Sequence, residues 1–236
     1  MSEEDKELIP ADDQFDASSN DVAEENSHSS YKVPGGICEI EKSTGYWRYV
    51  SDEADEIQAK KESEFISDEE IIHNVKFFLS ERGIFEKDEY TVDIVETMQG
   101  NGDAGVLVLE KNAYIYPLID GREVLGVYRL ILSFDSKGEI IGISSYYNPA
   151  EEYKSVELKS EQDAKNSLKE GNFSSSATEP LFDVKLEEVL LAYYSDAEPN
   201  REGFFLFPVY VFHGTGRPAG GGERINFNVI VDGVKN

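Results

Sequence analysis

The chain has 236 residues, enough for one large domain or two small domains with a buried core. Its 48 acidic and 22 basic residues give a net charge of −26, which would repel nucleic acid and anionic membrane surfaces. The single cysteine, Cys38, excludes an internal disulfide and every zinc or iron–sulfur site built on several cysteines. Two interpretations of the negative charge are open. It suits a cationic partner or divalent ions, or it serves only to keep the protein soluble.

The N-terminal residues 1–30 carry ten acidic residues and one lysine, with few large apolar side chains. Such a segment buries too little apolar surface to offset the entropy of ordering, so we expect a disordered, flexible acidic tail. It lacks the basic region and the apolar region that a signal peptide has. Two interpretations stay open: a spacer that follows a membrane anchor or removed leader, and a solvated terminus without a role.

The clearest helix is predicted over residues 67–83. Ser67 is an expected N-cap, Glu70 completes a capping box, and Gly83 closes the helix. An apolar stripe at helical spacing is formed by Ile71, Ile72, Val75, Phe78 and Leu79. The preceding residues 31–66 are mixed in character, and we expect Trp47 to pack against the fold.

Alternating strands are predicted after this helix. They cover residues 90–98, two short strands around a turn at Glu110-Lys111-Asn112, and a hairpin over 127–147 that turns at Asp135–Gly138. A second helix follows over 160–171, capped by Ser160, with Ala164 and Leu168 facing inward. Three more strands end the chain, and Pro208 predicts an edge position or a bulge for the middle one.

This order predicts an α+β fold of two tandem helix-plus-antiparallel-sheet units behind the acidic tail. The expected first unit covers residues 31–157, including an N-terminal extension. The expected second unit covers residues 158–236.

The stretch HGTGRPAGGGER, residues 213–224, matches the glycine pattern of a dinucleotide-binding loop between Gly214 and Ala219. That motif requires a helix after the loop and an acidic residue about 20 residues further on. Here more glycines and a β-like run follow, and Pro218 lacks an amide hydrogen. We predict a long, mobile link between the last two strands and no phosphate site.

Catalytic and metal motifs are absent from the sequence. The three histidines, His28, His73 and His213, lie far apart in the chain, and Cys38 has no evident histidine partner. His73 lies off the apolar stripe, so we expect it to face solvent. We predict that the protein is not an enzyme and has no catalytic residue, cofactor or metal site.

Tyrosines are the remaining feature of the sequence that indicates a function. Adjacent tyrosines in a strand point to opposite faces, so one of each pair can be exposed to a partner. The candidate partner-binding residues are Tyr114, Tyr116, Tyr146, Tyr147, Tyr193, Tyr194 and Tyr210. The alternative is that these side chains line the core between sheet and helix.

Three stretches resemble PepSY-type modules and the YycH/YycI group of two-component regulatory proteins. They are the helix of residues 67–83, the run VYRLILSFDSKGEIIGISSYY with its following helix, and the run from VLLAYY to INFNVIVD. The resemblance covers residues 67–232. It implies an extracytoplasmic module, tethered to the membrane or a lipoprotein, that binds a sensor kinase or a protease. This chain lacks the transmembrane helix of that group.

The leading hypothesis is therefore a non-enzymatic module outside the cytoplasm that binds a protein or peptide and regulates signalling or proteolysis. A membrane would be reached only through a missing anchor. The alternatives are a small-ligand or carbohydrate binder using a cleft between the units, and a hydrolase with an unrecognised carboxylate site. A cytoplasmic location is the alternative for localisation.

Overall fold

The computed structural model describes residues 28–42, 44–54, 57–85, 89–100, 106–147, 154–195 and 205–235. Of these residues, 54% lie in strands and 15% in helices, so the fold is largely β. The chain divides into two compact units. Unit 1 holds the described residues up to Pro117 and from Tyr128 to 147, and unit 2 holds the other described residues.

Seven strands form the sheet of unit 1, in the order β1-β2-β3-β8-β7-β5-β4, and every neighbouring pair is antiparallel. They are β1 (His28–Val33), β2 (Gly36–Glu41), β3 (Trp47–Ser51), β4 (Tyr90–Gly100), β5 (Val106–Ile119), β7 (Leu130–Phe134) and β8 (Ile140–Ser145). A one-turn 3₁₀ helix, η3 (Glu62–Glu64), precedes the long helix.

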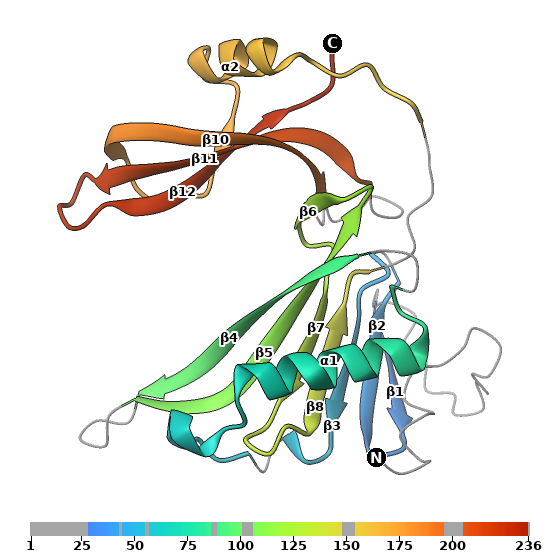
Figure 1. Ribbon diagram of the computed structural model, residues 1–236. Coiled ribbons are helices and arrows are strands. Elements are labelled where there is room, and N and C mark those ends of the chain that lie inside the picture. The colour runs from blue at the N-terminus through green and yellow to red at the C-terminus, as the bar shows by residue number, and fades with distance from the viewer. Residues whose placement is uncertain are drawn as a thin grey trace. The chain divides into compact units, whose positions relative to one another are not determined.

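Helix α1 (Asp68–Arg82) lies across one face of the unit 1 sheet (Figure 1). The Ser67 side chain accepts a hydrogen bond from the Glu70 amide, the Glu70 carboxylate accepts one from the Ser67 amide, and Gly83 is left-handed at φ 62°. These features confirm the predicted cap, capping box and C-terminal glycine. The predicted stripe is also confirmed: four of its five residues are buried and Ile72 is half-buried. His73 is exposed, as expected.

The core of unit 1 lies between α1 and the inward side chains of the sheet. Ile71, Val75, Phe78 and Leu79 of the helix pack there. The sheet contributes seven buried residues, which are Tyr49, Ala113, Ile115, Leu130, Leu132, Phe134 and Ile143. Trp47 packs against this cluster, as the sequence predicts. The opposite face of the same sheet carries no described helix, and this is the feature on which the candidate site depends.

Unit 2 contains five strands in the order β6-β10-β11-β12-β9. They are β6 (Arg122–Gly126), β9 (Ser174–Ser175), β10 (Leu181–Ser195), β11 (Phe207–Pro218) and β12 (Ile225–Asp232). The pair β6–β10 is parallel and the other pairs are antiparallel. Helix α2 (Glu161–Lys169) is capped by Ser160 and buries Ala164 in a cluster with Phe212, Phe227, Val229 and Val231. Its predicted cap and inward residues are confirmed.

The predicted α+β fold of two tandem helix-plus-antiparallel-sheet units is wrong. Eleven of the twelve described strands follow one hydrogen-bonded path, which continues from β5 through β6 to β10, while β4 pairs with β5 beside it. Strand residues outnumber helix residues more than threefold. Three strands, β1 to β3, precede α1 in a stretch that showed mixed character as sequence. The predicted tail of residues 1–30 lies outside the described residues, except that 28–30 begin β1.

Two local predictions are also wrong. The expected turn at Glu110-Lys111-Asn112 lies inside β5, a continuous strand whose polar middle is buried. The strand that contains Pro208 is not an edge strand, because β11 lies between β10 and β12. Pro208 is tolerated at the second residue of β11, where the β12 pairing has not yet begun. The hairpin turn at Asp135–Gly138 is confirmed, with Gly138 at φ 84°.

The glycine-rich stretch is mostly strand. Residues 213–218 belong to β11, so the connection to β12 is shorter than predicted. A Cβ at Gly214 would lie 2.7 Å from the Lys185 carbonyl oxygen and 3.1 Å from the Phe227 ring. A Cβ at Gly216 would lie 3.0 Å from Leu181 Cβ. These two glycines therefore allow close packing over β11, whereas only Gly221 and Gly222 adopt positive φ in the turn.

Substitution of Gly214 with alanine tests this assignment. The added methyl group would press on the backbone of β10, so we expect the free energy of unfolding to fall by about 2 kcal/mol. The control is Gly220→Ala in the same stretch, where the nearest atom is a carboxylate oxygen of Glu179 at 3.4 Å, and a change within about 0.5 kcal/mol is expected. Urea unfolding of both variants is the measurement, and equal stabilities would show that residue 214 lies in a flexible loop.

Candidate functional site

The seven candidate tyrosines do not form one site. Tyr114, Tyr116, Tyr146 and Tyr147 belong to unit 1, whereas Tyr193, Tyr194 and Tyr210 belong to unit 2. All seven are half-buried. The structure therefore divides the candidates into two groups with different surroundings.

The adjacent tyrosines in unit 1 point to opposite faces of the sheet. The Tyr147 ring packs 4.3 Å from the Phe85 ring and 5.4 Å from the Tyr128 ring, between centroids, on the side of the core. The Tyr146 ring instead lies 4.4 Å from the Tyr46 ring. Tyr147 is therefore a core residue, and Tyr146 is available on the other face.

The tyrosines of unit 2 take part in the packing of that unit. The Tyr210 hydroxyl donates to the Lys159 carbonyl oxygen at 2.7 Å, and its ring packs on the cluster beneath α2. Tyr194 packs against a second cluster, of Ala192, Val209 and Val211. These contacts give both side chains a structural role, so unit 2 offers the weaker part of the predicted site.

The remaining unit 1 tyrosines gather around Arg129. The Arg129 guanidinium carbon lies 5.4 Å from the centre of the Tyr114 ring, which is within cation–π range. Its side chain also bonds to Tyr116, and the Tyr146 amide donates to the Arg129 carbonyl oxygen at 3.1 Å. We call Tyr46, Tyr114, Tyr116, Tyr146 and Arg129 the tyrosine–arginine cluster.

The cluster lies on the face of the unit 1 sheet opposite α1, here called the open face. Alternation fixes this position, because Ala113 and Ile115 point into the core and the tyrosines beside them point away. In β4 the same alternation places Val92 and Ile94 in the core and leaves Asp93 outside. The open face is therefore the set of side chains that the packing of α1 leaves outward.

Two rows of side chains cross the open face beside the cluster. In the first row the register aligns Asp93, Tyr114, Ile131, Ser144, Arg48 and Glu39 across six strands. In the second row it aligns Val95, Asn112, Ser133, Gly142, Val50 and Ile37. Exposed apolar groups mark the second row, since Val95 is 50% exposed and Ile37 is 44% exposed.

Several polar side chains of the two rows form hydrogen bonds or ion pairs with neighbouring side chains. The Ser133 hydroxyl donates to Asn112 Oδ1 at 2.6 Å, and Asn112 Nδ2 donates to Thr97 Oγ1 at 3.0 Å and to Glu110 Oε1 at 3.1 Å. Arg48 pairs with Glu39. The face is therefore preorganised: its polar side chains are held, and its tyrosine rings are half-packed before any partner arrives.

Tyr116 and Tyr146 of the cluster remain neutral donors and acceptors near neutral pH. Burial raises the pKa of the Tyr116 hydroxyl above its ordinary value, and the nearby Arg129 offsets only part of this change. Burial, together with Tyr46 and Glu41, also raises the pKa of Tyr146. Neutral phenols of this kind can hydrogen-bond a partner without the desolvation cost of a buried charge.

The other chemically interesting residues stay apart from one another. His213 Nδ1 lies 2.7 Å from Asn228 Oδ1, His28 lies in β1, and His73 is on α1. Cys38 is buried, and burial raises the pKa of its thiol, which opposes nucleophilic chemistry. Among the described residues, no group of three or more metal-ligating side chains could hold an ion.

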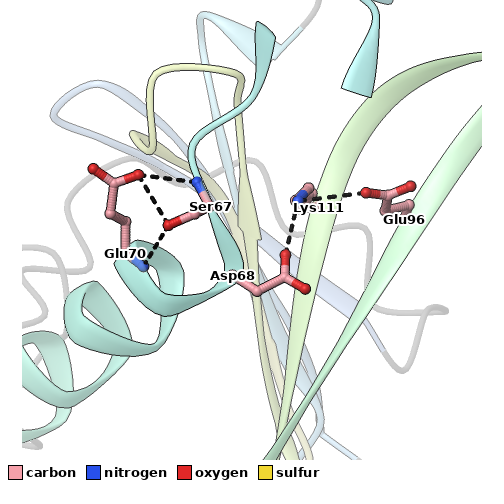
Figure 2. A network of polar contacts seen from close by, with 5 residues as sticks. All are labelled: Ser67, Asp68, Glu70, Glu96 and Lys111. Carbon is pink, nitrogen blue, oxygen red and sulfur yellow. Dashed lines mark hydrogen bonds and ion pairs between the residues drawn. The ribbon is translucent and has the colours of Figure 1, made fainter. Parts of the chain in front are cut away.

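One polar cluster needs separate consideration, because a buried lysine between two carboxylates can also serve catalysis. Lys111 Nζ donates to Asp68 Oδ1 at 2.7 Å and lies 3.4 Å from Glu96 Oε1 (Figure 2). The Lys111 side chain is only 6% exposed. Asp68 is in the first turn of α1, and Figure 2 shows it next to the Ser67–Glu70 capping box.

The charges of this cluster compensate one another. Burial alone would lower the pKa of Lys111, but its hydrogen bonds and attraction to Asp68 and Glu96 together raise it above the ordinary value. Lys111 is therefore protonated at neutral pH and offers no free amine for nucleophilic or base catalysis. We assign the cluster to structure: it joins the N-terminus of α1 to β4 and β5.

Sequence reasoning missed Arg129 and Tyr46. Arg129 is two residues before Ile131 in the same extended segment, so the sequence alone indicates that both side chains point to the same face of the sheet. The residues around it could not be predicted from the sequence, because they come from β5 and from the segment before β3. The strand register that brings them together depends on pairing over more than 80 residues of chain.

The chain matches no protein-family model, no curated protein and no solved structure. The resemblance to PepSY-type and YycH/YycI proteins therefore stays a prediction from sequence patterns. None of the helices in the described part of the chain combines the length and apolar content of a membrane span.

Replacement of Lys111 with methionine tests the structural role of the buried cluster. Loss of the ammonium group would leave Glu96, which is 20% exposed, without its cation. We expect a loss of about 2–3 kcal/mol in the free energy of unfolding, measured in urea. The double variant Lys111→Met/Glu96→Leu should regain much of this loss, because no buried charge is left unpaired.

The control for this experiment is Lys165→Met. Lys165 pairs with Glu161 on the surface of α2, where both side chains are about half exposed, and a change below about 0.5 kcal/mol is expected. If Lys111→Met were as stable as the control, the buried ion pairs would not hold α1 to the sheet.

Proposed function

We propose that this protein is a non-enzymatic binding module that holds a protein or peptide partner on the open face of unit 1. The observation that carries the proposal is the tyrosine–arginine cluster next to exposed apolar side chains of the same face. Val95, Val50 and Ile37 are 50%, 39% and 44% exposed.

The composition of the face supports this proposal. Tyrosine and arginine are the residue types that most often dominate the energy of protein interfaces, because each joins a broad apolar surface to hydrogen-bonding groups. Here the rings of Tyr114 and Tyr146 are already held by Arg129 and Tyr46. Binding would therefore cost little side-chain entropy.

The distribution of charge on the face also favours a protein partner over nucleic acid. Both arginines of the face are engaged, Arg48 with Glu39 and Arg129 with the tyrosines. Asp93 lies in the same row and is exposed. Lys32 is exposed opposite Ile37 in the second row, and a single lysine of this kind is a poor match for a phosphate backbone, whereas a mixed polar and apolar protein surface would be matched.

The cellular setting belongs to the proposal as well. The resemblance to extracytoplasmic regulatory modules supports a place outside the cytoplasm and a sensor kinase or a protease as the partner. Fractionation of cells that express the native gene tests this part. Recovery of the protein in the cytoplasmic fraction alone would contradict it without affecting the assignment of the open face.

Substitutions on the open face test the binding role. Partners are cross-linked to the full chain in the native membrane and soluble fractions, identified by mass spectrometry, and titrated in purified form. Tyr114→Ala should weaken binding about 30-fold or more, since loss of a central tyrosine commonly removes about 2 kcal/mol. Val95→Lys should weaken binding without touching the core, because Val95 is 50% exposed.

The matched controls are Tyr193→Ala and Val156→Lys, which change residues of the same types in unit 2. Both should bind the partner as the wild type does. Thermal unfolding of all four variants separates lost binding from lost folding. Unchanged affinity in Tyr114→Ala and Val95→Lys would rule out the open face as the binding surface.

A further inference from the structure

We infer that unit 2 carries a second binding site, at the outer edge of β10, which accepts an extended basic segment of a partner protein as an additional strand. This site does not depend on the open face of unit 1. It follows from the pairing of β10, from its exposed apolar side chains and from the charge of the strand.

The first observation is an unpaired strand edge. β10 pairs with β11 from Leu181 to Tyr194 on one side. On its other side it pairs with β6 only over Tyr193–Ser195. From Leu181 to Ala192 no described strand occupies this second side, so it presents backbone groups that another strand can bond.

The second observation is the exposure of apolar side chains along the same segment. Phe182 is 63% exposed, Val184 is 50% exposed and Leu186 is 40% exposed. Val184 and Leu186 lean over Gly216 and Gly214 of β11, and their outer surfaces remain open to solvent. A strand added to β10 would cover these surfaces with its own apolar residues, as cross-strand neighbours do within a sheet.

The third observation is the charge of the other face of β10. Register places Lys185 and Glu188 beside Thr215 and His213, on the side away from Leu186. Lys185 Nζ lies 3.4 Å from Glu187 Oε1, and Glu188 is exposed and forms no ion pair with a described residue. Arg217 lies opposite Phe182 at one end of this face, so the carboxylate that lysine or arginine on the added strand would meet is Glu188, towards the other end.

A second copy of this chain fits the edge less well than a basic segment. Each β10 edge carries irregularities between Phe182 and Lys185 and between Leu186 and Glu188, so two copies would have to match one irregular edge to another. Bulges of this kind twist an edge away from flat pairing with its own copy, whereas a flexible segment can follow the twist. The occupant we infer is therefore extended, with apolar residues alternating with basic ones.

The test uses the full chain and a short acetylated peptide of alternating lysine and valine. The comparison peptide has glutamate in place of lysine. Hydrogen exchange should slow at the backbone amides of residues 181–190 with the lysine peptide and stay unchanged with the glutamate peptide. Slowing spread evenly over the acidic surface, or absent from these amides, would overturn the inference.

Two substitutions sharpen the result. Glu188→Lys should weaken binding of the lysine peptide by about tenfold and should make the glutamate peptide the better ligand, because like charges opposed across a strand pair are unfavourable. Val184→Lys should weaken the lysine peptide by a similar factor. The controls, Glu139→Lys and Val156→Lys, change exposed residues away from β10 and should bind as the wild type does.

Self-association is measured in parallel by sedimentation. Slow exchange at residues 181–190 that grows with protein concentration in the absence of peptide would identify a second copy as the occupant and overturn the inference. The open-face variants Tyr114→Ala and Val95→Lys separate the two proposals. They concern the partner of unit 1, so failure of either site leaves the result at the other site interpretable.

Discussion

The packing of α1 on one face of the unit 1 sheet is the constraint on which the rest of that unit depends. Once Ile71 and Phe78 are buried there, strand alternation decides which side of every strand is core and which side is surface. The buried Lys111 fixes this arrangement further, because its ion pairs tie the first turn of the helix to β4 and β5. A shift of one residue in β5 would expose Ala113 and bury Tyr114, and it would also remove the lysine from Asp68. The outward tyrosines are thus a consequence of how the helix is held.

In unit 2 the packing depends on two glycines of β11. Its β11 carries Gly214 and Gly216, so the strand has no side chains of its own to fill that part of the face beneath α2. Side chains from β10, including Leu186, lean across to fill the space. The position of Arg224 supports this arrangement, since its guanidinium bonds to the carbonyl oxygens of both Asp183 and Thr215 and holds the two strands together. The irregular, partly exposed edge of β10 follows from this lean.

The sequence predicts those parts of the fold that local signals determine. The cap at Ser67 and the stripe below it need only a few neighbouring residues, and both are confirmed. The polar run around Lys111 reads as a turn because its partners, Asp68 and Glu96, are 43 and 15 residues away in the chain. The glycines before β12 read as a flexible link because composition does not reveal a neighbouring backbone. Alternation shows that one of Tyr146 and Tyr147 faces outward, but the packing of Phe85 on Tyr147 decides which one.

The two candidate surfaces make different demands on their partners, and the acidic character of the chain explains the difference. On the open face Arg48 pairs with Glu39 and the tyrosine rings lie beside exposed apolar side chains, so affinity there would come mainly from aromatic and apolar contact. The β10 edge keeps an exposed carboxylate, Glu188, and draws on the net charge of −26. Attraction at that edge is long-range and screened by salt, whereas contact with the tyrosine rings is short-range and much less sensitive to salt. The two proposed surfaces would therefore act differently: the open face would select a partner by shape, and the β10 edge would attract a basic one.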